Sequence, residues 1–108
     1  MIAIRFACLA VALAVATPVL AAPRLTDSQF VRASRCHALA KASSLEGGDA
    51  ALFTALIKAQ RQARADHIVE KASQAASAAS GQARRADAAA KADLIAERDG
   101  SCQALLAR

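Results

Sequence analysis

The chain has 108 residues, with 14 lysines and arginines against nine acidic residues, and a formal net charge of +5. The basic residues are dispersed, with no run of four, and the chain has no tryptophan or tyrosine to stack on bases. Both observations argue against a nucleic-acid-binding surface. Alanine inflates the hydrophobic content of 56%, so large apolar side chains for a core are scarce.

Residues 1–21 have the three-part layout of a cleavable secretory signal peptide. Arg5 precedes an apolar run, which Pro18 ends shortly before a pair of small residues. Cleavage after Ala21 places short side chains where the peptidase requires them and leaves residues 22–108 as a single domain. Alanine-rich chains that prefer arginine to lysine are typical of bacteria with GC-rich genomes. We therefore expect a periplasmic or secreted protein.

Two other interpretations of this N-terminal segment are weaker. The apolar run ends at Leu20 and spans about 15 residues, against roughly 20 needed to cross a bilayer, so a membrane anchor is disfavoured. A lipid anchor on Cys8 would need a complete apolar region before the cysteine, and Arg5 to Ala7 supply none. Cys8 is expected to leave with the signal peptide.

The first helix is expected over residues 27–42. Thr26 is a favourable N-cap, and Gln29 stands three residues later, as in a capping box. An apolar stripe follows at helical spacing, formed by Phe30, Ala33, His37 and Ala40. The segment 43–48, which ends in two glycines, is expected to stop this helix.

A second helix is expected from Asp49 onward. Its predicted apolar face consists of Leu52, Leu56, Ala59 and Ala63, with Phe53 and Gln60 beside it. Beyond Arg64 the apolar positions move around the helix by roughly 150 degrees. The helix either kinks or breaks near Asp66, or it continues and meets a different neighbour there.

Residues 70–93 contain no large apolar side chain and approach low complexity. Their alanine, arginine, glutamine and lysine favour helix, while disorder stays open because such a segment buries little apolar surface. We expect helix, interrupted at Ser80–Gly81, and a last helix from 82 to 106. Gly100 within that helix costs about 1 kcal/mol relative to alanine and indicates a local bend.

Cys36 and Cys102 are the two cysteines that remain after cleavage. An even pair in a small exported chain is most simply interpreted as a disulfide. Closing a loop of about 66 residues stabilises a fold by roughly 4 kcal/mol in the chain-entropy model. That is a large contribution for about 87 residues with a small core.

The predicted disulfide selects among helix arrangements. Chain reversals at 47–48 and at 80–81 place the two cysteines about 6 Å apart in height. A further full reversal at Asp66 would leave Cys102 about 25 Å from the level of Cys36. The sequence therefore predicts an all-α, three-helix, up-down-up fold with a long alanine-rich helical hairpin and one disulfide.

The candidate chemical motifs are incomplete. Residues 33–37, Ala-Ser-Arg-Cys-His, resemble a haem-attachment sequence that lacks its first thiol. His37 and His67 lie about 13 residues apart in height in the predicted fold, too far to share one metal ion. Ser34 and Ser73 stand near histidines only as helical serines commonly do. We therefore expect no catalytic residues, no cofactor and no metal.

The leading hypothesis is an exported, non-enzymatic helical protein that binds another envelope component through its hairpin faces. The alternative, from a different class, is a weak binder of anionic membrane or lipopolysaccharide surfaces. The sequence leaves the identity of the partner and the oligomeric state open.

Overall fold

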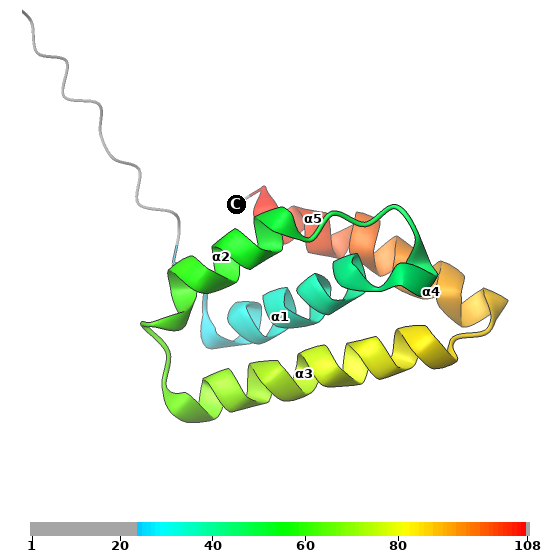
Figure 1. Ribbon diagram of the computed structural model, residues 1–108. Coiled ribbons are helices and arrows are strands. Elements are labelled where there is room, and N and C mark those ends of the chain that lie inside the picture. The colour runs from blue at the N-terminus through cyan, green and yellow to red at the C-terminus, as the bar shows by residue number, and fades with distance from the viewer. Residues whose placement is uncertain (1–23, 108) are drawn as a thin grey trace, which may run out of the picture.

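The computed structural model describes residues 24–107, so the predicted signal peptide and its cleavage site after Ala21 lie outside the described residues. Between 24 and 107 the chain is helical and contains no strand, as the sequence predicts. The elements are α1 (Asp27–Lys41), the 3-10 helix η1 (Ser43–Leu45), α2 (Ala51–Arg61), α3 (Asp66–Arg85), α4 (Ala88–Asp99) and α5 (Ser101–Leu106). Figure 1 shows α1 lying between α2 and α3, with α4 and α5 along another side.

The start of α1 confirms the predicted capping box. The Gln29 backbone N–H donates to the Thr26 hydroxyl at 3.1 Å, and the Thr26 N–H donates to the Gln29 side-chain oxygen at 2.9 Å. Asp27 in the first turn and Lys41 in the last complement the helix dipole. The start of this helix is therefore fixed by its own local sequence.

Helix α1 is the centre of the fold. It packs most extensively against α3, next against α2, and also touches α4 and α5. Its buried residues surround the helix axis, and three successive positions from Ala38 to Ala40 are all buried. A helix that buries residues on several sides is surrounded by its neighbours. The other helices therefore form a coat around α1.

The loop after α1 returns close to that helix. Gly47 has a φ of +72°, which favours glycine, and a Cβ on Gly48 would overlap the Ala40 carbonyl oxygen. From α4, the buried Arg98 donates to the carbonyl oxygens of Leu45 at 3.0 Å and Glu46 at 2.6 Å. This guanidinium satisfies two backbone acceptors that the turn leaves without helical partners.

The expected interruption at Ser80–Gly81 is wrong. Helix α3 continues through Gly81, which is buried in the helix, and ends at Arg85. A single glycine costs a helix about 1 kcal/mol, which the helix formers around it can offset. The chain turns instead at Asp87, whose carboxylate accepts the Ala90 N–H at 2.8 Å as the N-cap of α4. Apart from this turn, residues 70–93 are helical.

The predicted three-helix arrangement is wrong for the same reason. Helix α2 ends at Arg61, α3 begins at Asp66, and the chain reverses direction between them (Figure 1). With a turn at 80–81, this reversal would be incompatible with the disulfide. Because the turn lies about six residues later, positions beyond it move by about twelve residues, or roughly 18 Å, relative to α1. That shift brings Cys102 to within about 7 Å of the level of Cys36, so an additional reversal and the cysteine pair are compatible.

Helix α2 is rotated relative to the sequence prediction. Leu52, expected in the core, is 62% exposed, whereas Phe53 is fully buried. Gln60, buried on the same side, accepts the Leu25 backbone N–H at 3.3 Å. Phenylalanine buries more apolar area than leucine, and this hydrogen bond satisfies a buried donor. The helix therefore turns its phenylalanine inward and leaves part of its leucine face outside.

Gly100 marks a bend, as expected. Helix α4 ends at Asp99, α5 begins at Ser101, and the Gly100 N–H donates to the Ala96 carbonyl at 2.9 Å. The bend redirects the chain so that Cys102 and Leu105 are buried.

Candidate functional site

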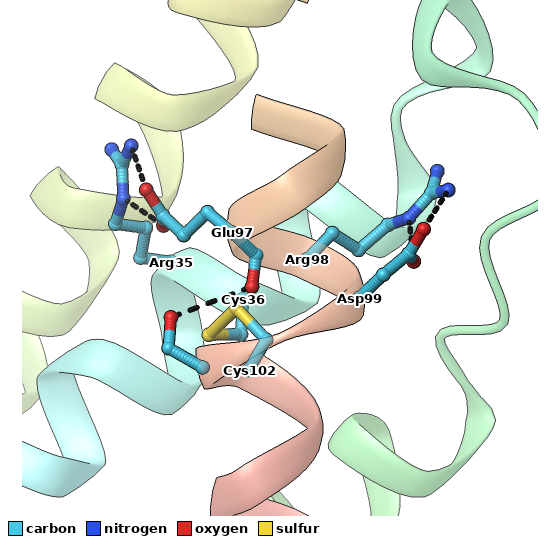
Figure 2. Close-up of a disulfide and its surroundings, with 7 residues drawn as sticks. Arg35, Cys36, Glu97, Arg98, Asp99 and Cys102 are labelled. Atoms are coloured by element: carbon cyan, nitrogen blue, oxygen red, sulfur yellow. Dashed lines mark hydrogen bonds and ion pairs between the residues drawn. A yellow bond between two sulfur atoms is a disulfide. The ribbon is translucent and has the colours of Figure 1, made fainter. Parts of the chain in front are cut away.

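Cys36 of α1 and Cys102 of α5 are joined in the structure. Their sulfur atoms lie 2.09 Å apart, their Cα atoms lie 5.5 Å apart, and both residues are fully buried (Figure 2). With Cys36 bonded in this way, residues 33–37 offer no free thiol for a haem group. The pair links the central helix to the last one.

Two arginines flank the disulfide (Figure 2). Arg35 donates to both carboxylate oxygens of Glu97, from Nε at 2.7 Å and from Nη2 at 3.0 Å, and this hydrogen bonding raises the pKa of Arg35. Arg98 donates to Asp99 at 2.9 Å, which lowers the pKa of that carboxyl group. The Arg98 guanidinium therefore favours the ionised form of the Asp99 carboxyl group. We call the contacts of α1 and its loop with α4 and α5 the disulfide side.

The serines and histidines that the sequence singled out do not form a catalytic set. The Ser34 hydroxyl donates to the Phe30 carbonyl oxygen at 3.3 Å, as serines in helices often do. His37 Nε2 lies 2.9 Å from the Thr54 hydroxyl oxygen, and burial, followed by the charge of Lys41, lowers the pKa of His37. His67 and Ser73 are exposed on α3. Residues 24–107 contain no cluster of three or more histidines, cysteines or carboxylates that could hold a metal ion.

Ser34, His37 and Ser73 instead line one hollow surface. Four depressions, of about 190 to 340 Å³ each, follow α1, each sharing lining residues with the next. One is lined by both α2 and α3, one by α2 and two by α3. His37 borders three of them. We call this continuous surface the α2–α3 groove. Since His37 and Lys41 lie roughly opposite Arg35 and Cys36 around the axis of α1, the groove and the disulfide occupy opposite sides of that helix.

The floor of the α2–α3 groove comes from α1. It is formed by Phe30, Ser34, His37, Ala38 and Lys41. Phe30 is held from behind by the guanidinium of Arg64, which lies 5.3 Å from the ring centroid and forms an ion pair with Asp27 at 2.8 Å. The Arg64 side chain is only 3% exposed, and it also donates to the Leu25 carbonyl oxygen. The floor is therefore firmly positioned.

The walls of the α2–α3 groove combine small, hydroxyl and basic side chains. Helix α3 contributes Ser73, Ala76, Ser77, Ser80 and Arg84, and α2 contributes Thr54, Ile57, Lys58 and Arg61. The described residues that line the four depressions include four lysines and arginines and no carboxylate. The hollow is therefore basic at its edges and partly apolar on its floor.

Sequence reasoning missed this groove because its residues come from three separate helices. The basic residues at 58 and 61 and the serines at 73, 77 and 80 stand at helical spacings and could have indicated continuous faces. The sequence alone does not show that these two faces border the same stretch of α1. That placement depends on the reversal of the chain between α2 and α3.

Comparisons with protein-family models, with curated proteins and with solved structures found no match for this chain. Among the helices of residues 24–107, none is long and apolar enough to cross a lipid bilayer.

Proposed function

We propose that this is an exported, non-enzymatic protein of the periplasm or of the medium that binds another envelope component. The observation that carries the proposal is the α2–α3 groove, a concave surface with an aligned series of basic and hydroxyl side chains. Such a surface suits recognition, which needs many weak contacts over an extended area. The disulfide on the opposite side of α1 suits a protein that must keep this surface in shape outside the cell.

The non-enzymatic part of the proposal is supported by the hydrogen bonds of the candidate nucleophiles. A serine nucleophile requires its hydroxyl within hydrogen-bonding reach of a base. The Ser34 hydroxyl donates to a main-chain carbonyl, and His37 has Thr54 as its neighbour at 2.9 Å. The depressions are also open and shallow, unlike pockets that enclose most of a small substrate.

Site-specific photocrosslinking in the native host envelope tests the binding function. A photoreactive residue at position 77, on the edge of the groove, should give a defined adduct that excess unlabelled protein removes by competition. A matched probe at Ala89, exposed on α4, should not give that adduct. Equal adducts from both positions, or none from position 77, would contradict binding through the groove.

Export is tested separately on protein recovered from its host. Intact-mass analysis should show a chain that begins at Ala22 and has lost two hydrogens to one disulfide. A chain that retains Met1, or that carries two free thiols, would remove the basis for an exported protein.

A second candidate function is weak binding to anionic membrane or lipopolysaccharide surfaces. The observation that favours it is that the exposed side chains of Lys41, Lys58, Arg61 and Arg84 gather around one hollow. Binding to anionic vesicles should then disappear with neutral lipid or at high salt, because salt screens exposed charges. Absence of binding to anionic vesicles at low salt would exclude this candidate.

A further inference from the structure

We infer that the ligand of the α2–α3 groove is an acidic amphipathic α-helix of a partner protein, laid along α1 between α2 and α3. This inference rests on the proposed binding function and specifies its ligand. It is carried by the length of the groove, the size of the side chains on its α3 wall and the placement of its charges.

The length fits a helix of several turns. The floor of the groove follows α1 from Phe30 to Lys41, and the last depression extends to Ser44. From Phe30 to Lys41, at 1.5 Å per residue, the floor is about 17 Å long, or about three turns of a helix. A helix laid in a groove is a common form of peptide recognition, with apolar anchors at intervals of three and four residues.

The side chains of the α3 wall permit close approach. Ser73, Ala76, Ser77 and Ser80 follow one another at steps of three, one and three residues along the edge of α3. All are small, and the distance between packed helices decreases with the size of the side chains between them. Ile57 and Val69 add apolar contacts toward one end of the floor. The wall therefore offers a helix both room and apolar area.

The charges specify an acidic ligand. Lys58 and Arg61 stand on the α2 side, and Lys41 and Arg84 stand at the far end of the groove. All four are exposed, and within the described part of the chain none of them forms an ion pair. By contrast, Arg35, Arg64 and Arg98 are each paired with a carboxylate. The unpaired cations are complementary to carboxylates on the flanks of an incoming helix.

Other anionic ligands fit the groove less well. An acyl chain requires an enclosed apolar cavity, whereas these depressions are open and carry several hydroxyl groups. A membrane surface is flat on this scale, and here the cations stand on the α2 side and at the far end of a concave floor. A narrow convex ligand with charged flanks reaches both sets of cations together.

A synthetic helical peptide tests the inference directly. The probe is an 18-residue peptide (about 27 Å of helix) with leucine and alanine on one face and glutamate on both flanks. Fluorescence anisotropy with the oxidised protein should show saturable binding. Two matched peptides should bind at least tenfold more weakly: one with each glutamate replaced by glutamine, and one with the same composition in an order that destroys the apolar face.

Charge-reversal variants locate the binding site. Lys58→Glu with Arg61→Glu should weaken binding of the acidic peptide about tenfold or more, which is about 1.4 kcal/mol. The matched control, Arg32→Glu with Lys71→Glu, changes the net charge equally at exposed positions outside the groove and should leave binding within about twofold. Circular dichroism and the disulfide content of each variant establish that it is folded.

Three outcomes would overturn the inference. The first is no saturable binding of the acidic peptide, the second is equal weakening by both pairs of charge reversals, and the third is equal binding of the peptide with a scrambled apolar face. Vesicle binding that depends on Lys58 and Arg61, without peptide binding, would assign the groove to a lipid surface instead. If the crosslink from position 77 persists while the peptide fails to bind, the binding function stands and only the acidic-helix ligand is wrong.

Discussion

The two sides of α1 are built on different principles. On the disulfide side, α4 and α5 make few contacts with α1 but are tied to it and its loop by a covalent bond, by the Arg35–Glu97 ion pair and by Arg98. On the groove side, α3 packs broadly against α1 with no such tie to that helix from a disulfide or ion pair among residues 24–107. A small chain that is cross-linked on one side can leave the other side hollow.

Because the buried side chains of α3 are small, the fold needs the stabilisation that the disulfide on the other side of α1 provides. The buried residues of α3 are Ala72, Ala79, Gly81 and Ala83. Alanine and glycine bring two helices close together but remove little apolar surface each, and apolar burial contributes about 25 cal/mol per Å². The packing of α3 on α1 therefore extends over a long contact but contributes only modestly to the free energy of unfolding. We expect perturbations of the disulfide side to cost more than perturbations of the groove edge.

The largest expected effect comes from breaking the covalent tie. Replacing both cysteines, Cys36→Ala with Cys102→Ala, should lower the free energy of unfolding by about 4 kcal/mol, because the unfolded chain regains the entropy of a loop of about 66 residues. Denaturant titration followed by circular dichroism measures this difference. A loss below about 1 kcal/mol would mean that the noncovalent contacts of the two sides suffice by themselves.

The next effect comes from Arg98. Arg98→Met keeps much of the buried stem but leaves the carbonyl oxygens of Leu45 and Glu46 without their donor, which should cost about 2 kcal/mol. The matched control is Asp99→Asn, which alters the exposed partner of the same arginine and should unfold at nearly the same denaturant concentration as the unaltered protein. Equal losses from both variants would show that the ion pair, and not the contact with the loop, carries the effect.

Two glycine substitutions should change stability in opposite directions. Gly48→Ala places a methyl group against the Ala40 backbone and should lower the free energy of unfolding by about 2 kcal/mol. Gly81→Ala, within α3, has the movable end of the Arg85 side chain as its nearest neighbour, at 3.1 Å, and should raise the free energy of unfolding by about 0.5 kcal/mol through helix propensity. Thermal unfolding compares the two variants. A destabilised Gly81→Ala would indicate that the close approach of α3 needs glycine.

The smallest effect is a pH dependence from the groove floor. Because burial lowers the pKa of His37 below its ordinary value of 6.5, the unfolded chain takes up the proton first. The free energy of unfolding should therefore decrease as the pH falls below about 6.5. Above that range His37 is neutral in both states and should add no pH dependence. His37→Gln should flatten the profile between pH 7 and pH 5, whereas His67→Gln, at an exposed position, should leave it unchanged. Identical slopes for both variants would contradict this role of His37.

Local signals predicted local structure well. The capping box at Thr26 and Gln29, the helical class and the bend at Gly100 all depend on residues within one turn of each other. Such features depend little on the rest of the chain, because their hydrogen bonds join neighbours in sequence.

The failures all involved competition between distant contacts. Gly81 suggested a turn, but its burial within α3 and the stronger N-cap at Asp87 moved that turn toward the C-terminus. In the same way, Leu52 belonged to the more regular apolar stripe. Phe53 is buried instead, in the core cluster that includes residues of α1, and Gln60 accepts the backbone N–H of Leu25, just before α1. The groove could not be predicted because it depends on both of these outcomes together.

The central position of α1 also has a consequence for the order of events during folding. A ribosome makes α1 before any of the helices that cover it, so the packing of α1 against α3 forms only after α2 has been made. Cys36 cannot find Cys102 until 66 further residues have followed, and contacts of such long range make folding slow. The bond can therefore close only after α2, α3, α4 and the start of α5 have been made.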